Sequence, residues 1–255
     1  MSKYQKTPGQ PFCFGKKEKR NDYRTLQFAD YLVPSLPPPP VASDNLARVY
    51  KALGVSDPTQ LYPMDGNDTE GDCTIAGRGH FITTANAFLG QKVIPTAADV
   101  LAFYLQLTGG QDTGLDLLTV CNYCHQNGYL GQAPDLAFVE VDPTNLVHMK
   151  TAISMFGFLY VGFQVQANAI KEFQQRKPWT PGKLTQDGHC VVLADYTAAD
   201  YVALTWGNTQ LGTYAWAKEC LDEAYAIVPA AASTPGYIPG FNTQQLLADL
   251  AAVTK

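Results

Sequence analysis

An apolar stretch that begins at Cys73 most constrains how this chain can fold. It reads CTIAGRGHFITTANAFLG, and its residues Ile75, Phe81 and Phe88 recur at helical spacing. Asp72 stands at the position of an N-cap, and Gly90 is a stop signal for a helix. We therefore expect a central, buried helix that begins at Cys73.

The order of the remaining elements indicates the fold class. Helices are expected at residues 44–53, 96–108, 115–126 and 147–156, and each is followed by a glycine at its end. Strand-like runs come later, at residues 159–165, 190–194 and 201–205. A late helix is expected at residues 216–227. Helices first and strands second favour an α+β fold with segregated layers.

Two terminal regions differ from the centre of the chain. Residues 1–45 are polar and then Pro-rich, ending in SLPPPP at residues 35–40, which is typical of an extended arm. Residues 46–228 form the expected main domain. Residues 229–255 combine a Pro/Gly/Ala linker with a terminal helix at 242–253 that could dock on this chain or on a partner.

The composition indicates which classes of partner and which cellular compartment to expect. The chain has 255 residues, 16% charged residues and a net charge of −5, so no electrostatic feature favours nucleic acid or an anionic membrane. No window approaches the length of a transmembrane helix, and the start MSKYQKTPGQ lacks the apolar region of a secretory signal. We expect a cytoplasmic protein whose six cysteines are thiols.

One cysteine and three other residues could together carry out nucleophilic chemistry. Cys73 at a helix start lies where the helix dipole stabilises a thiolate. His189 leads a buried strand and could serve as its base, and the amide of Asn67 could hold an oxyanion. Asn208 follows a Trp-Gly pair and could orient the imidazole of His189.

The order of these residues resembles the papain-like cysteine peptidases. That family places a Gln six residues and a Gly two residues before its nucleophile, and Asn67 and Gly71 stand there ahead of Cys73. The run from residue 148 to 165 resembles the helix-Gly-strand unit before the family's catalytic histidine. DGHCVV at residues 187–192 resembles its His-Ala-Val strand. The resemblance spans about residues 60 to 210.

The resemblance implies a two-lobed fold, a helical lobe with the nucleophile helix plus an antiparallel β-sheet lobe. It implies a cysteine-dependent hydrolase of peptide or amide bonds that needs no cofactor and no metal. The chain departs from the family at three positions: Asn67 replaces Gln, Thr74 replaces the Trp after the nucleophile, and Leu204-Thr205 stand where the family has its Asn. Asn208 is the first candidate for that third residue, and Asp195 is the second.

A second hypothesis comes from a different functional class. A papain-like fold with weakened chemistry could serve as a structural or interaction protein in a phage or bacterial assembly, such as a virion. The N-terminal arm and the C-terminal helix would then contact an assembly partner. Under the first hypothesis the partner is a peptide or protein substrate. Neither hypothesis involves nucleic acid or a membrane.

Other histidines and cysteines are interpreted as packing residues. The CNYCH sequence at residues 121–125 matches the haem c attachment pattern and a CxxC redox pair, but it lies in an amphipathic helix of a chain without a secretory signal. One CxxC supplies only two zinc ligands. His80 is two helical turns from Cys73, too far to be its base. Cys13, Cys190 and Cys220 have no partner spacing.

Overall fold

The computed structural model describes residues 10–234 and 236–253, so residues 1–9, 235, 254 and 255 of the expected terminal regions lie outside it. Its helices are α1 Asn45–Leu53, α2 Cys73–Phe88, α3 Ala97–Thr108, α4 Leu117–Asn127, α5 Leu146–Phe156, α6 Ala169–Gln174, α7 Tyr214–Cys220 and α8 Thr243–Val253. Its strands are β1 Ala137–Glu140, β2 Leu159–Gln166, β3 Leu184–Tyr196, β4 Asp200–Thr205, β5 Asn208–Thr213 and β6 Leu221–Val228. Short 3-10 turns are η1 Phe28–Tyr31, η2 Pro58–Gln60 and η3 Ala230–Ser233. None of the described helices has the length and apolarity to cross a membrane.

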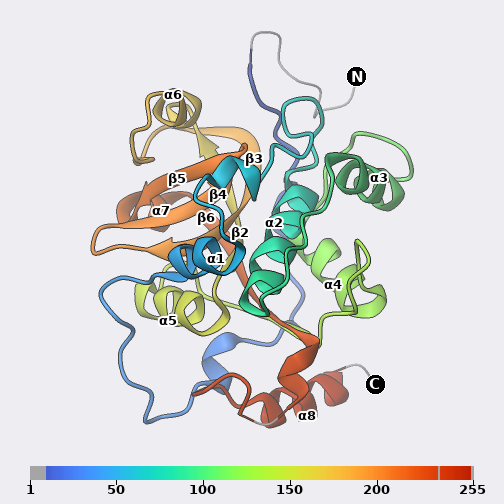
Figure 1. The fold of residues 1–255 in the computed structure, drawn as a ribbon, viewed down its shortest axis with the longest axis vertical. Helices are drawn as coiled ribbons and strands as arrows, with labels where there is room; N and C mark the ends of the chain where they lie inside the picture. Colours follow the sequence, from blue (N-terminus) through green and yellow to red (C-terminus); the bar gives the residue numbers. More distant parts are fainter. Residues whose placement is uncertain (1–9, 235, 254–255) are drawn as a thin grey trace.

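Helix α2 is the central helix that the sequence predicts (Figure 1). Its residues are buried except Ala85 and Phe88, because α1, α3 and α4 cover it on one side and the sheet on the other. Gly77 allows the close approach to the sheet. A Cβ there would lie 3.1 Å from the Tyr160 ring and 3.3 Å from Cys190 Sγ.

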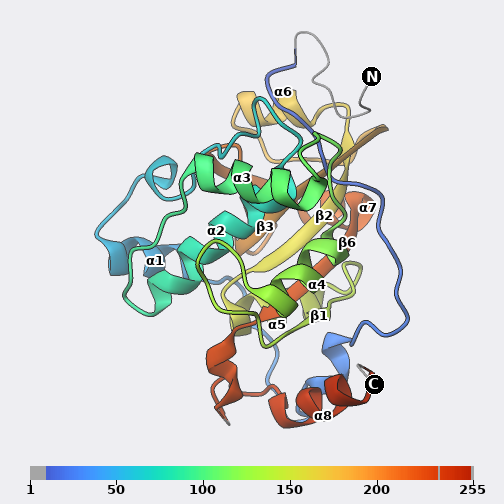
Figure 2. The ribbon, with the colours of Figure 1, turned by 90° about the vertical axis from the view of Figure 1, so that its right-hand side faces the viewer.

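The six strands form one antiparallel sheet in the order β1-β6-β2-β3-β4-β5. Consecutive side chains of a strand point to opposite faces. The Cys190 face of β3 packs against α2. The opposite face of the sheet, with Val191, packs against α5 at β3 and against α7 at β2, β5 and β6 (Figure 2). The expected α+β fold of helices and an antiparallel sheet is confirmed.

The helix expected at residues 216–227 is wrong over its second half. Helix α7 ends at Cys220, and β6 begins at Leu221 and lies between β1 and β2. A strand in the middle of a sheet that is covered on both faces is apolar along its length, so it carries no alternating pattern. The residues AYAIV at 224–228 form such an apolar run, and the acids before them, Asp222 and Glu223, pair with Lys16. Strands β1 and β5 and helix α6 were also not indicated by the sequence.

The described part of the expected arm packs along the molecule (Figure 2). Gln27 forms an isolated β-bridge with Glu140 of β1. The η1 turn that follows packs against the C-terminal helix α8. The Tyr31 hydroxyl donates to Asp249 Oδ2 at 3.1 Å. Helix α8 therefore docks on this chain, against the arm, rather than extending away from it.

Candidate active site

Cys73 is the first residue of α2, and its side chain is buried. The unpaired N–H groups at a helix start favour a thiolate. Burial raises the pKa of Cys73 to about 11, although the backbone N–H groups of Gly15 and Cys190 face the sulfur and favour the ionised form. The thiol is therefore protonated at neutral pH in this structure.

His189 is held in a fixed orientation on β3. Its Nε2 lies 2.8 Å from the Thr205 Oγ1, and the Trp206 ring stacks on the imidazole at 4.7 Å with an interplanar angle of 23°. Burial lowers the pKa of His189 to about 3, and the nearby His80 contributes in the same direction. Among the described residues Nδ1 has no hydrogen-bond partner. The imidazole is therefore neutral, with one nitrogen engaged.

Cys73 and His189 reach the same part of β3 without forming a hydrogen bond. The Cys73 sulfur meets the backbone N–H of Cys190, the residue directly after His189. No hydrogen bond between the two side chains occurs within the described chain, because Nδ1 of His189 is unpartnered and Nε2 bonds elsewhere. His189 is thus one residue along β3 from the N–H that the Cys73 sulfur faces, and both side chains are neutral.

Neither candidate for the third residue contacts His189. Asn208 begins β5, and its Oδ1 accepts the N–H of the next residue, inside the hairpin turn. Asp195 accepts the backbone N–H groups of Asn45 and Leu46 at 2.8 and 2.9 Å. Asp195 therefore holds the start of α1, where a carboxylate meets the unpaired N–H groups of a helix.

Thr205 holds the place that sequence reasoning assigned to Asn208. Because side chains alternate along β4, Leu204 packs in the core with α2 while Thr205 faces the imidazole. The signal was present in the sequence as a hydroxyl residue directly before the pair Trp206-Gly207. The family pattern predicts an amide rather than a hydroxyl at this position, so the pattern alone does not indicate Thr205.

Asn67 is already engaged beside the nucleophile. Its Nδ2 donates to Asp72 Oδ1, and its backbone oxygen accepts the N–H of Cys13 at 2.7 Å. Asp72 occupies the N-cap position of α2, but its side chain makes no capping hydrogen bond. Burial raises the pKa of Asp72 to about 8, so the acid is largely protonated at neutral pH. The amide expected to hold an oxyanion therefore serves this buried acid.

Residues 12–16 of the arm pass between the start of α2 and β3, where the resemblance puts a substrate cleft. A Cβ on Gly15 would lie 1.6 Å from the Gly71 carbonyl oxygen. A Cβ on Gly188 would lie 2.5 Å from the Lys16 carbonyl oxygen. Glycine at these positions lets the backbones touch. The backbone hydrogen bonds of the segment are Cys13 N–H to Asn67 O (2.7 Å), Lys16 N–H to Gly188 O (3.1 Å) and Leu115 N–H to Gly15 O (2.9 Å).

One phenylalanine of this segment meets the imidazole, and another covers the Trp206 ring that stacks on it. The Phe14 ring meets the His189 ring edge-on at 5.7 Å, and the Phe12 ring stacks on Trp206 at 4.3 Å. Both phenylalanines are less than a tenth exposed. The arm thus excludes water from His189, which is the physical cause of its lowered pKa.

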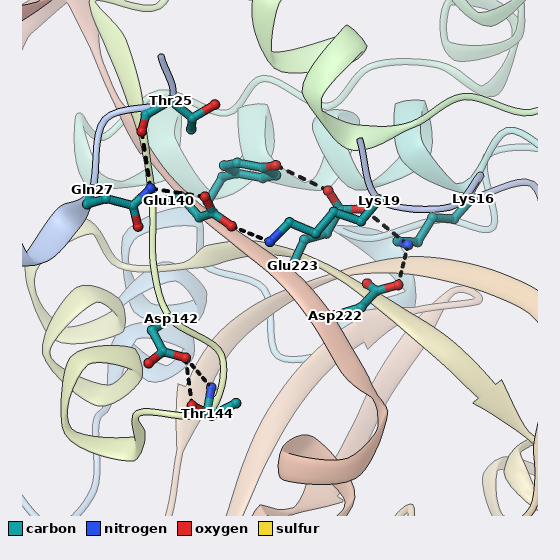
Figure 3. A network of polar contacts seen from close by, with 10 residues as sticks. Lys16, Lys19, Thr25, Gln27, Glu140, Asp142, Thr144, Asp222 and Glu223 are labelled. Carbon is teal, nitrogen blue, oxygen red and sulfur yellow. Dashed lines mark hydrogen bonds and ion pairs between the residues drawn. The ribbon is translucent and has the colours of Figure 1, made fainter. Parts of the chain in front are cut away.

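Lys16 anchors the segment to the sheet. Its Nζ lies 2.8 Å from Asp222 Oδ2 and 3.1 Å from Glu223 Oε1, and Figure 3 shows the ammonium between the two carboxylates. Its side chain crosses β2 at Gly162, where a Cβ would be 2.0 Å from it. Burial alone would lower the pKa of Lys16, but the two carboxylates raise it. Burial raises the pKa of Glu223 to about 7.

His80 is a hydrogen-bonded histidine within α2. Its Nε2 lies 3.0 Å from the carbonyl oxygen of Pro63 and 3.3 Å from Asp65 Oδ2. These contacts fix the loop that precedes Cys73. The structure shows no hydrogen bond between His80 and Cys73 in the part of the chain it describes.

The CNYCH sequence lies in α4. Cys121 and Cys124 are fully buried, and His125 Nδ1 lies 2.9 Å from the carbonyl oxygen of Asp135. Across residues 10–234 and 236–253 no three His, Cys, Asp or Glu side chains gather as metal ligands, and no disulfide joins the cysteines. Both cysteines act as packing residues of the core behind α2.

Comparison with known proteins shows the fold. No family model matches the chain, and a search of curated proteins finds no match. Among solved structures, the chain is similar to xylellain, a cysteine protease from Xylella fastidiosa, with a TM-score of 0.62 and 14% identity over 90% of this chain and 99% of that one. It is also similar to procathepsin B S9 from Trypanosoma congolense, with a TM-score of 0.58 and 11% identity over 85% and 86% of the two chains. Procathepsin L 3 from the larval midgut of Tenebrio molitor has a TM-score of 0.56 and 11% identity over 82% and 75%.

These similarities show that the chain has the fold of the papain-like cysteine proteases. At 10 to 14% sequence identity, these similarities establish the fold and nothing further. The predicted family resemblance is confirmed at that level.

Proposed function

We propose that this chain is a papain-like thiol hydrolase of peptide or amide bonds, held latent by its own arm. One observation carries the proposal: His189 is oriented through Nε2 by Thr205 and covered by Trp206, its Nδ1 has no partner among the described residues, and the next residue along β3, Cys190, turns its backbone N–H toward the Cys73 sulfur. An imidazole held this way has a fixed ring orientation, and in the tautomer that carries its hydrogen on Nε2 the free Nδ1 can accept a proton.

The chemistry requires the arm to leave the cleft. Water would then reach the thiol and the imidazole, and both pKa values would return toward their ordinary range. Nδ1 of His189 would take the thiol proton, and the thiolate of Cys73 would attack the carbonyl carbon of the substrate. The amine leaves with the proton from the imidazole, and water then hydrolyses the thioester.

The oxyanion of this reaction needs two donors. The backbone N–H of Cys73 is one, because the first N–H groups of a helix have no helical acceptor. The second is Asn67 Nδ2, which must leave Asp72 to reach it. Loss of the arm removes the Cys13 contact that holds the Asn67 backbone, which would free the loop to move.

The test is hydrolysis of a fluorogenic peptide library by the full-length protein and by Gly15→Val, in which the new side chain cannot fit beside Gly71. We expect hydrolysis by Gly15→Val that Cys73→Ala in the same background abolishes. Cys190→Ala in that background is the matched control, since it removes a neighbouring buried thiol. Equal hydrolysis with and without the Cys73 thiol would refute the proposal.

A structural or interaction role in a phage or bacterial assembly is the second candidate. The observation that favours it is the depth of the arm, since Phe12, Phe14 and Lys16 belong to the protein interior rather than to its surface. If that role is correct, Gly15→Val destabilises the protein without producing any hydrolysis. The expected peptide or protein partner and the cytoplasmic or virion location stay predictions under either candidate.

A further inference from the structure

A cavity of about 380 Å³ opens at the other end of α2 from Cys73. Its walls come from α1, the second half of α2, residues 129–135, the end of α5 and residues 229–238 (Figure 1). Phe88 in its wall is about 22 Å along the helix from Cys73. The cavity is therefore separate from the candidate active site, and it has the size of pockets that hold small molecules.

The body of the cavity is apolar. Its wall includes Phe81, Ile82, Phe88, Phe156, Phe158 and Ile238. At its rim Leu89 is 59% exposed and Tyr237 is 44% exposed, although both are large apolar side chains. Exposed apolar groups around a hollow favour a ligand with an apolar body.

One cation stands in this apolar wall. Arg48 of α1 is exposed, and its guanidinium lies 4.9 Å from the centroid of the Phe88 ring. No carboxylate of the described chain forms an ion pair with it. The one acid in the wall, Asp135, is paired with the buried Arg78 instead. A guanidinium in this setting is free to bind a carboxylate through two parallel hydrogen bonds.

A second donor lies across the cavity. Gln132 accepts a hydrogen bond from Asn86 Nδ2 at 3.2 Å through its Oε1. Its Nε2 makes no hydrogen bond to any residue that the structure describes. Both side chains line the cavity, so an amide donor accompanies the guanidinium in the wall.

We propose that this cavity binds a small apolar carboxylate, with Arg48 pairing with the carboxylate and the aromatic wall enclosing the apolar body. A free aryl or alkyl acid and the C-terminal residue of a peptide share this chemistry. The site is independent of the chemistry proposed for Cys73.

Isothermal titration calorimetry on the full-length protein tests the proposal. The probes are 4-phenylbutyrate and its neutral counterpart 4-phenylbutanol. N-acetyl-Ala-Phe as free acid and as amide distinguishes a peptide end from a free acid. We expect each acid to bind about fivefold more tightly than its neutral counterpart, the gain that a partly exposed ion pair provides.

Variants locate the effect. Arg48→Gln should remove the preference for the acid and leave binding of the alcohol unchanged, whereas Arg176→Gln, at another exposed arginine, should change neither. Ala85→Phe should fill the cavity and abolish binding of both probes, with circular dichroism to confirm folding. Absence of binding to the wild type, or a preference for the acid that survives Arg48→Gln, would overturn the proposal.

Discussion

The two sides of the candidate site are prepared to different degrees. On the strand side, the imidazole of His189 has a fixed orientation from Thr205 and Trp206 and one free nitrogen. On the helix side, Cys73 is buried and protonated, and Asn67 is bonded to a protonated acid. Under the proposed function, the difference places the latency in the arm and in the loop before α2, and not in the orientation of His189.

The largest expected effect comes from removing the anchor of the arm. Lys16→Met leaves Asp222 and the buried Glu223 without their cation. Breaking one partner of a buried ion pair costs about 3–5 kcal/mol. We expect a loss of that size in the free energy of unfolding, measured with urea at pH 8, where Glu223 is ionised in the wild-type protein.

Glu223→Gln added to Lys16→Met is the control, because it removes the buried charge that the first change leaves behind. It should restore part of the lost stability. If Lys16→Met leaves the free energy of unfolding unchanged, the ion pair does not anchor the arm. The anchored arm would then no longer explain why Cys73 is buried.

A change at the point of backbone contact should release the arm from the site, and the reactivity of Cys73 reports the effect on the helix side. Gly15→Val places a side chain where the Gly71 carbonyl oxygen lies. Overpacking of this kind costs roughly 1–3 kcal/mol, and the cost falls on the closed position of the arm. We expect alkylation of Cys73 by iodoacetamide, followed by mass spectrometry, to rise by up to about a hundredfold.

Glu18→Ala is the matched control for this change, since Glu18 is an exposed arm residue outside the segment at 12–16. It should leave alkylation of Cys73 at the wild-type rate. Equal rates in Gly15→Val and Glu18→Ala would show that the arm does not protect the thiol.

A change at Thr205 should act on the strand side alone. Thr205→Val keeps the shape but leaves Nε2 of His189 buried without its partner, a cost of about 1–3 kcal/mol. In the Gly15→Val background we expect hydrolysis to fall by roughly tenfold to a hundredfold, whereas Thr205→Ser retains the hydroxyl and most of the activity. A Thr205→Val variant with undiminished hydrolysis would remove the orienting role of this residue.

The smallest effect is a pH dependence of stability. Asp72 has a pKa of about 8 in the folded protein against an ordinary value of 3.8, so the folded state holds a proton that the unfolded state has released. The stability from this group is present at low pH and is lost as the pH rises through 8. Glu223 acts in the same direction up to about pH 7. His189 is neutral in the folded protein, and its ordinary pKa of 6.5 leaves it only partly charged in the unfolded chain over this window, so its opposing effect is small.

We therefore expect the free energy of unfolding to fall by roughly 1.5 kcal/mol between pH 6.5 and 8, as measured by urea unfolding. Asp72→Asn should flatten this slope. A free energy of unfolding that rises over the same window would mean that Asp72, beside Cys73, is ionised in the folded protein. The helix side would then not be held in the neutral, unreactive state that distinguishes it from the strand side.

The local parts of this architecture could be predicted from the sequence. The central helix from Cys73 follows from its spacing and from the turn before it, and the strands at His189 and Tyr201 follow from their β-branched and apolar runs. β6 could not be predicted, because a strand covered on both faces has no alternating pattern. The contact of Thr205 with His189 could not be predicted from the family pattern, because the pattern has an amide side chain where this chain has a hydroxyl.

The threading of the arm could not be predicted at all. Gly15, Gly71 and Gly188 lie far apart in the sequence, and only their contacts explain why each lacks a side chain. The Lys16 ion pair likewise joins residues more than two hundred positions apart. In the sequence Lys16 stands in a short basic run that is typical of a solvated surface.

The most direct test of the central claim is the rate of Cys73 alkylation by iodoacetamide at pH 6 in Gly15→Val, with and without His189→Ala. If the arm conceals a competent pair, Gly15→Val reacts faster at pH 6 than a free thiol does, and His189→Ala removes that excess. A rate in Gly15→Val no greater than that of a free thiol, or one unaffected by His189→Ala, would contradict the claim.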